Sequence, residues 1–190
     1  MGVMRVLLSI VGDRDPFSID RETGAREPGP ILTLATEREF DAAYLYHTAD
    51  DSSRKRAGIT EAALRNVRQG IAVTPVELQV TDPTSHFQLI SALRPHLNGL
   101  RDRSGAAEFF ISIASGTPAM HAVWMLLAAS DEIHANILYI RPRRFVTSDQ
   151  PLIGEINPRA PEFPQISRRV GLQDVAVAGS EEINAIARKL

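Results

Sequence analysis

The chain has 190 residues, of which 44% are hydrophobic and 23% charged, so it is long enough to bury one substantial core. Its formal net charge of -2 argues against a surface that coats nucleic acid, because such binding needs many Lys and Arg contacts to phosphates. With no cysteine, the chain forms no disulfide, thiolate zinc site or cysteine nucleophile. It has no long apolar run and no signal-peptide pattern, so we expect a soluble, cytoplasmic protein that does not enter a membrane.

Short segments rich in β-branched or aromatic residues alternate with segments of helical spacing. Strands are predicted over residues 4–11, 40–48, 74–80, 108–114 and 135–141. Helices are predicted over 55–69, 83–99 and 118–129, with a short helix between the first two strands. This alternation predicts an α/β fold, a Rossmann-like parallel sheet of about five to six strands with helices on both faces.

Two of the predicted helices carry more detailed signals. In the segment 83–99 and just beyond it, helical spacing is shown by Phe87, Ile90, Leu93, Leu97 and Leu100. Asp82 is predicted as the N-cap, Pro83 fits the first helical position, and Pro95 predicts a kink. In the segment 118–129, the apolar side chains are predicted to be core: Met120, Val123, Trp124, Leu126 and Leu127.

The character of the chain changes past residue 142. A proline-rich stretch without helical period predicts ordered loop and one short strand over 152–157. Helical spacing returns over 180–190, with Ser180 as the predicted N-cap. We therefore expect an α/β domain over residues 1–145, an extension over 146–179, and a helix over 180–190. That helix is either an ordinary C-terminal helix or the linker to a downstream domain.

Two loops are expected to meet at one edge of the sheet. If the strand order is 3-2-1-4-5, the winding reverses between the first and fourth strands, and ligands of open parallel sheets bind at that point. The residues concerned are Gly12, Asp13, Arg14, Asp15 and Pro16 in one loop, and Ser115, Gly116, Thr117, Pro118, Met120 and His121 in the other. Gly116 permits positive φ, Thr117 is a helix cap, and free N–H groups there favour an anion such as phosphate.

Simpler interpretations stay open for each of these features. A Ser-Gly-Thr-Pro turn is also a good strand-to-helix connection, and Asp15-Pro16 alone is an ordinary turn. The basic stretch Arg141–Arg144 follows the fifth strand on the same edge and is either a phosphate contact or, more simply, an exposed turn. The five histidines show no metal-ligand spacing, so no metal is predicted. No G-x-G-x-x-G and no P-loop motif occurs, so no cofactor is predicted either.

Three segments taken together carry a resemblance to a known family. VLLSIVGDRDPF, GPILTLATEREFDAAYLYHT and ISIASGTPAMHAVWMLLAA occur in an order and spacing that resembles the CARF family, the CRISPR-associated Rossmann-fold sensor domains. The similarity covers about residues 4–142. Within that family, the Ser-Gly-Thr-Pro-Ala-Met and Gly-Pro-Ile-Leu segments are most similar to the sensor domain of sigma-54-dependent regulators of RNA repair, the RtcR type. They are also similar to the front domain of type III CRISPR ribonucleases.

The resemblance implies a ligand-sensing domain over residues 1–145 that forms a homodimer. Both protomers would contribute their two loops to a pocket for cyclic oligoadenylate or for an RNA end with a 2',3'-cyclic phosphate. Binding would control an effector domain that is not visible in this chain, such as a sigma-54-dependent activator. Some CARF domains instead cleave their ligand, and the candidates for such a ring nuclease are Arg14, Ser115 and Thr117. The sensor and the enzyme both remain open, and no catalytic residue is assigned.

Overall fold

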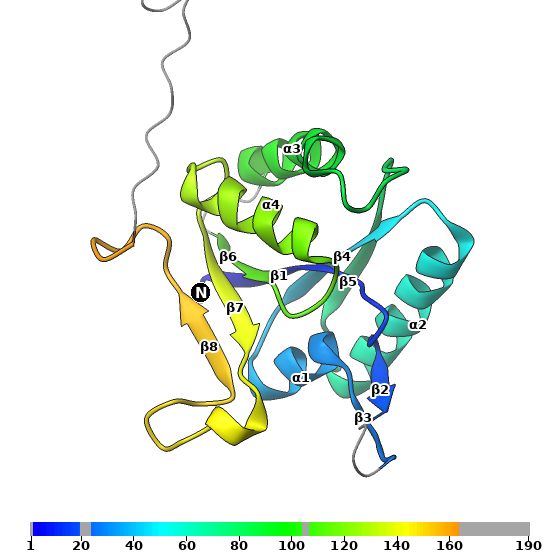
Figure 1. The fold of residues 1–190 in the computed structure, drawn as a ribbon, viewed down its shortest axis with the longest axis vertical. Coiled ribbons are helices and arrows are strands. Elements are labelled where there is room, and N and C mark those ends of the chain that lie inside the picture. The colour runs from blue at the N-terminus through cyan, green and yellow to red at the C-terminus, as the bar shows by residue number, and fades with distance from the viewer. Residues whose placement is uncertain (1, 20–23, 104–106, 164–190) are drawn as a thin grey trace, which may run out of the picture.

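The computed structural model describes residues 2–19, 24–103 and 107–163, and these build one main sheet (Figure 1). The sheet contains β1 (Met4–Ile10), β4 (Ala42–Thr48), β5 (Ala72–Leu78), β6 (Ala107–Ser112), β7 (Ala135–Ile140) and β8 (Ile153–Ile156). Its strand order is β5-β4-β1-β6-β7-β8, in which the first five strands are parallel and β8 runs antiparallel to β7. The predicted Rossmann-like α/β fold is confirmed, and its five parallel strands have the order 3-2-1-4-5 that the expectation for the two loops assumed.

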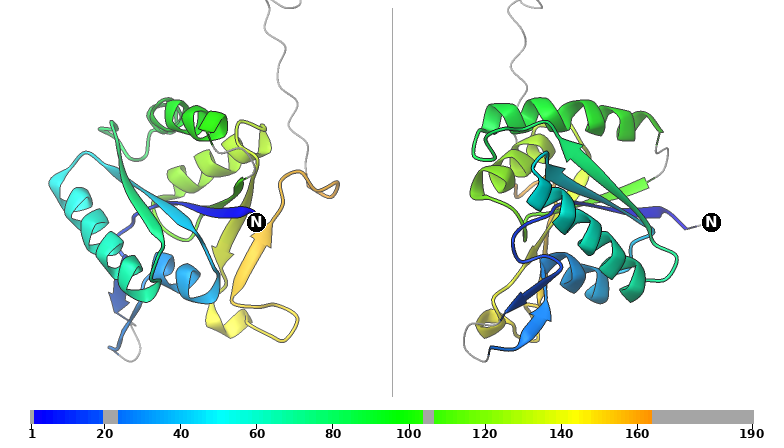
Figure 2. Two further views of the ribbon diagram at one scale, coloured as in Figure 1. Left: turned by 180° about the vertical axis from the view of Figure 1, so that it is seen from behind. Right: turned by 90° about the vertical axis from the view of Figure 1, so that its right-hand side faces the viewer.

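Helices cover both faces of this sheet, as Figures 1 and 2 show. They are α1 (Pro30–Glu37), α2 (Asp51–Val67), α3 (His86–Arg103) and α4 (Pro118–Ala129). Alternate residues of a strand point to opposite faces, so β1 contributes to two separate cores. Val6, Leu8 and Ile10 pack with residues of α3 and α4, whereas Leu7 packs with residues of α1 and α2.

Two smaller elements complete the described structure. The hairpin of β2 (Phe17–Ile19) and β3 (Arg26–Pro28) follows β1, and a 3-10 helix, η1 (Arg143–Phe145), follows β7. The predicted short helix between the first two parallel strands is α1, and the strand predicted over 152–157 is β8. Because β8 pairs with β7, the sheet continues past residue 145. The helix predicted over 180–190 lies outside the described residues.

Several helix boundaries differ from the prediction for local reasons. The helix α2 begins at Asp51 rather than at 55, because the side chain of Asp50 accepts a hydrogen bond from Ser53 N at 2.9 Å and caps it. The prediction of Asp82 as the N-cap of α3 is wrong. Its carboxylate accepts from Thr84 N at 2.9 Å in a turn, and α3 begins later, at His86. Pro95 does lie inside α3.

Two apolar side chains that were expected inside lie outside. Phe87 on α3 is 81% exposed, and Leu89 instead is fully buried. On α4, Leu126 is 46% exposed, while the other predicted core residues of that helix are buried. Both exposed side chains are on helices that cover the same face of the sheet, α3 and α4.

A buried aromatic cluster joins β4 to these two helices. The Trp124 ring lies 5.4 Å from the Tyr46 ring, and the Tyr46 hydroxyl is 2.9 Å from His96 Nδ1. Burial raises the pKa of the Tyr46 hydroxyl. Trp124 Nε1 is buried and has no hydrogen-bond partner among the described residues. None of the described helices is long and apolar enough to cross a membrane.

Candidate ligand-binding site

Three segments of the chain meet around one buried carboxylate, that of Asp15. It accepts hydrogen bonds from Gly12 N at 3.0 Å, from Ile31 N at 3.0 Å and from the Ser115 hydroxyl. Asp15 and Ser115 are each only 4% exposed. The loop after β1, the first turn of α1 and the loop after β6 are therefore joined through a single side chain, which we call the Asp15 network.

The environment of Asp15 has two opposing effects on the pKa of its carboxyl group. Burial raises the pKa of the Asp15 carboxyl, because a low-dielectric surrounding disfavours the charged form. The three donors and the nearby Arg14 guanidinium act in the opposite direction. Three neighbours donate hydrogen bonds to this carboxylate from within the protein, and the Asp15 side chain is buried. Asp15 therefore holds the loops together and is not open to a ligand.

Glycines allow the two loops to touch. A Cβ atom on Gly12 would stand 2.7 Å from Gly116 N, closer than real Cβ atoms approach backbone. Gly116 itself has φ of +100°, and a Cβ there would lie 3.0 Å from Met120 Sδ. The positive φ expected at Gly116 is confirmed, and the neighbourhood of the two loops is confirmed with it.

The start of α4 is fixed by Thr117. Its hydroxyl oxygen accepts from Met120 N at 3.2 Å and donates to Pro83 O at 3.0 Å, while Thr117 N donates to Met120 Sδ at 3.3 Å. Pro118 is the first residue of the helix, where a missing N–H costs nothing. The predicted capping role of Thr117 is confirmed, and its hydroxyl hydrogen is donated to Pro83 O. Met120 is buried under the loop.

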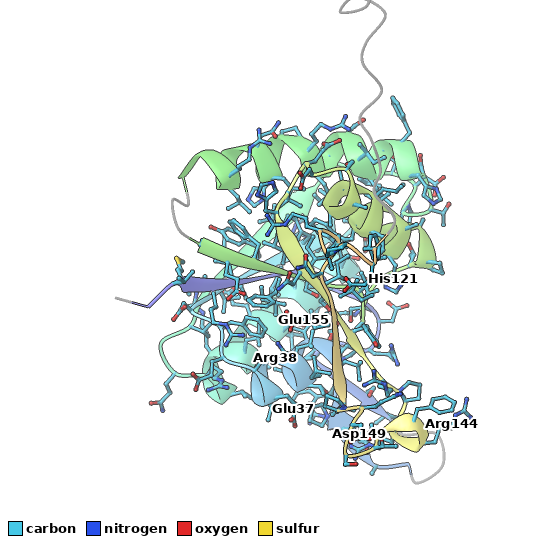
Figure 3. The ribbon with its side chains drawn as sticks, turned by 90° about the vertical axis from the view of Figure 1, so that its left-hand side faces the viewer. Glu37, Arg38, His121, Arg144, Asp149 and Glu155 are labelled. Atoms are coloured by element: carbon cyan, nitrogen blue, oxygen red, sulfur yellow. The ribbon has the colours of Figure 1, made fainter. Side chains whose placement is uncertain are left out.

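A cavity of about 610 Å³ lies beside the two loops. Two of the predicted site residues line it, Arg14 and His121. The Arg14 guanidinium donates to Ala114 O at 3.1 Å, and His121 Nε2 is 2.9 Å from Ser115 O. A carbonyl oxygen only accepts, so Nε2 carries the hydrogen in that bond. Figure 3 shows this side of the molecule, with His121 near the start of α4.

The remaining predicted site residues form the frame of the cavity or point elsewhere. The frame consists of Gly12, Asp15, Pro16, Ser115, Gly116, Thr117, Pro118 and Met120, none of which lines the cavity. Asp13 is exposed and forms an ion pair with Arg56 at 3.0 Å. Of the predicted site residues, Arg14 and His121 thus line the cavity, while the others lie in the elements around it or point away.

Much of the cavity wall comes from residues that the sequence analysis did not select. They are Ser18, Glu27, Pro28, Pro30, Thr33, Thr36, Glu37, Tyr139, Ile140, Arg141, Pro142, Arg143 and Leu152, with Ile113 and Ala114 beside the second loop. The only sequence signal for any of them was the basic stretch after the fifth strand.

Two arginines of that stretch, Arg141 and Arg143, line the cavity and behave differently. Arg141 is held in place, since its guanidinium donates to the Tyr139 hydroxyl at 3.0 Å and to Pro151 O. Arg143 is largely exposed, and its closest carboxylate, Glu27 on β3, is 3.8 Å away. The cavity therefore has cationic groups at its rim. Within the described ranges, no group of three or more His, Asp or Glu could hold a metal ion.

No protein-family model matches the chain, and no curated protein sequence matches it. Solved structures do match, and they define the chain as a domain with a Rossmann-like α/β fold. It is similar to Enterococcus italicus Csm6 bound to cyclic hexa-2'-fluoro-hexa-dAMP, with a TM-score of 0.67 and 16% identity over 82% of this chain and 42% of that one.

A second solved structure is more distant. Can2 from Sulfobacillus thermosulfidooxidans, in complex with cyclic tetra-adenylate, matches with a TM-score of 0.45 and 12% identity over 72% of this chain and 32% of that one. This chain thus spans less than half the length of Csm6 and less than half the length of Can2.

Proposed function

We propose that the chain is a CARF-type sensing domain that binds an RNA-derived nucleotide. The observation that carries the proposal is the convergence of Arg14, from the loop after β1, and His121, from the first turn of α4, on one cavity at the carboxyl ends of parallel strands. Ligands of open α/β sheets bind at such a point. The likeness of the fold to Csm6, which was solved with a cyclic oligonucleotide, supports this choice of ligand class.

The chemistry of the cavity suits a phosphodiester ligand. Its volume of about 610 Å³ lies within the usual range for small-molecule sites. The Arg14 guanidinium has five N–H donors and makes one contact, to Ala114 O, among the described residues. Charge-assisted hydrogen bonds to phosphate are stronger than neutral ones. Cyclic oligoadenylate is therefore the first candidate, and an RNA end with a 2',3'-cyclic phosphate is the second.

Binding without cleavage is the better-supported activity. A ring nuclease built on these loops would use Arg14, Ser115 and Thr117. The Ser115 hydroxyl is buried and donates to Asp15, and the Thr117 hydroxyl donates to Pro83 O. Only Arg14 of the three lines the cavity. We therefore propose a regulatory domain in the cytoplasm whose bound ligand controls an effector, such as a sigma-54-dependent activator of RNA repair.

This function is tested by calorimetric titration with cyclic tetra-adenylate, cyclic hexa-adenylate and a short RNA that ends in a 2',3'-cyclic phosphate. The ligand is then recovered and analysed by chromatography. Saturable binding with intact ligand is the expected result. A linear product would instead support the ring nuclease, and no binding of any of the three would overturn the proposal.

Arg14→Ala is expected to weaken the binding of the tightest of these ligands roughly 10-fold to 100-fold, because a charge-assisted hydrogen bond to phosphate is lost. Thermal melts should be unchanged, since Arg14 is exposed. The matched control is Arg101→Ala, an exposed arginine on α3 that does not line the cavity. Equal affinity of both variants would remove Arg14 from the site.

The predicted homodimer has its own test. Exposed apolar side chains on α3 and α4, Phe87 and Leu126, are candidates for a two-fold interface, since symmetric dimers are the commonest oligomers. We expect light scattering at micromolar concentration to give twice the mass of one chain. The mass of a single chain, both with and without the bound ligand, would contradict the dimer.

A further inference from the structure

A tyrosine and an arginine at the end of β7 line the cavity together. Tyr139 and Arg141 are two residues apart along the strand direction, so both side chains point to the same side of the sheet. The Arg141 guanidinium donates to the Tyr139 hydroxyl at 3.0 Å, and its carbon lies 5.4 Å from the centre of the Tyr139 ring, a cation–π contact. The two side chains are therefore joined to each other, and we call them the β7 pair.

The neighbouring strand, β8, holds the β7 pair in place. Gly154 is the register partner of Tyr139, and a Cβ atom on Gly154 would overlap the Tyr139 ring. The ring therefore lies against backbone that no side chain covers. Arg141 is held by the same segment, since its backbone N donates to Leu152 O at 2.8 Å and its guanidinium donates to Pro151 O. Side chains that are fixed before binding lose less conformational entropy when a ligand binds.

The β7 pair keeps hydrogen-bond donors for a ligand. A guanidinium has five N–H donors, and that of Arg141 forms two bonds among the described residues, to the Tyr139 hydroxyl and to Pro151 O. The Tyr139 hydroxyl accepts from Arg141, and its own hydrogen has no acceptor in the described part of the chain. Both members of the β7 pair can therefore donate to a ligand in the cavity that they line.

The charge of Arg141 is not balanced by a carboxylate. Of the ion pairs formed within residues 2–19, 24–103 and 107–163, none involves Arg141, whereas Arg143 pairs with Glu27 on β3 at 3.8 Å. The other carboxylate of the cavity lining, that of Glu37, is on α1. A partly buried cation with unused donors attracts an anionic oxygen, and its bond to such an oxygen is charge-assisted. The β7 pair is therefore suited to a phosphate group.

We propose that Tyr139 and Arg141 together bind one phosphate of the ligand, and that Gly154 positions them from outside the cavity. The inference rests on the proposed function and adds the residues that hold the phosphate. One phosphate oxygen accepts from the Tyr139 hydroxyl, and the Arg141 guanidinium donates to the same phosphate group. Gly154 does not line the cavity, so it acts on the ligand through the position of the Tyr139 ring.

Calorimetric titration of the whole chain with cyclic tetra-adenylate and cyclic hexa-adenylate tests the β7 pair. Arg141→Ala is expected to weaken binding of the tighter ring roughly 10-fold to 100-fold, because a charge-assisted hydrogen bond is lost. Tyr139→Phe keeps the ring over Gly154 and removes the hydroxyl alone, so a loss of roughly 2-fold to 10-fold is expected. The matched control is Arg144→Ala, a neighbouring exposed arginine on η1 that does not line the cavity (Figure 3). This variant should bind like the parent.

The positioning role of Gly154 is tested in two backgrounds. Gly154→Ala displaces the Tyr139 ring and should weaken binding by the parent chain roughly 10-fold. In a chain that already carries Tyr139→Phe and Arg141→Ala, the same change should cost less than about 3-fold, because the two groups that it displaces no longer bind phosphate. A glycine with a purely structural role would lower the affinity equally in both backgrounds.

A second glycine serves as the control for the added methyl group. Gly58 lies on α2, where a Cβ atom meets nothing within 4 Å, so Gly58→Ala should leave the affinity unchanged. Thermal melts verify that each variant is folded.

The outcomes separate this inference from the function beneath it. Equal affinity of Arg141→Ala and Arg144→Ala for both rings overturns the β7 pair as a phosphate site. An equal loss from Gly154→Ala in both backgrounds overturns its positioning role. Either result leaves the sensing function intact, because the parent chain still binds its ring. If neither ring binds to the parent chain, the inference is overturned, and the proposed function then depends on binding of the RNA end alone.

Discussion

Replacement of Asp15 by alanine is expected to lower the free energy of unfolding by about 3 kcal/mol or more, the largest effect on stability that we predict. The change leaves three donors without an acceptor in a buried site, namely Gly12 N, Ile31 N and the Ser115 hydroxyl. Each buried donor that loses its partner costs about 1–3 kcal/mol, and partial relaxation lowers the sum. Denaturant unfolding followed by circular dichroism measures the loss.

Two comparison variants show whether the Asp15 network is the cause. Asp15→Asn keeps the shape and one acceptor oxygen but turns an NH2 group toward a donor, so its stability should lie between that of the parent and that of Asp15→Ala. Asp13→Ala removes a neighbouring carboxylate that is exposed and pairs with Arg56, and it should be nearly silent. If Asp15→Ala unfolds at the same denaturant concentration as Asp13→Ala, the three segments do not depend on this carboxylate.

Gly116→Val is expected to produce the largest loss of ligand affinity, more than about 100-fold, because it disturbs both loops at once. A β-branched residue is strained at a φ of +100°, and its Cβ would press on Met120 Sδ from 3.0 Å. Relief of that contact moves the loop whose carbonyls at Ala114 and Ser115 hold Arg14 and His121. Calorimetric titration measures the affinity, and denaturant unfolding measures the accompanying loss of stability.

The chain supplies a matched control for backbone strain. Gly70 also has positive φ, +88°, but a Cβ there meets nothing within 4 Å, and it lies in the turn between α2 and β5. Gly70→Val should therefore share the strain, about 1–3 kcal/mol of stability, and leave binding unchanged. Equal affinities of the two valine variants would show that the loop after β6 does not shape the site.

The sheet could be predicted from the sequence because its strands are short, rich in β-branched residues and separated by connections of helix length. The rules for parallel connections then leave few strand orders, and the order assumed for the site is the one observed around β1. Boundaries were less certain. Asp50 was not recognised as the cap of α2, and Asp82 was assigned to α3 although its carboxylate closes a turn on Thr84.

The frame of the candidate site could be predicted, but most of its cavity could not. The residue types alone predict the backbone roles of Gly116, Thr117 and Pro118. Glycine is favoured at positive φ, threonine at a helix N-cap and proline at the first helical position. The wall of the cavity is formed instead by residues of α1, β7 and η1. Their positions depend on tertiary packing, which no local sequence pattern predicts. Likewise, Asp15 resembles an ordinary turn residue, because two of its three donors, Ile31 N and the Ser115 hydroxyl, come from other segments of the chain.

The solitary tryptophan offers an optical signal that needs no label. Trp124 is fully buried on α4, the helix whose first turn carries His121, and its indole N–H has no hydrogen-bond partner in the described part of the chain. An indole in such apolar surroundings emits at short wavelength, and its emission shifts when the packing around it changes. Any ligand that displaces α4 relative to Tyr46 should therefore alter the fluorescence of the native protein, so that titrations can be followed in real time at low concentration.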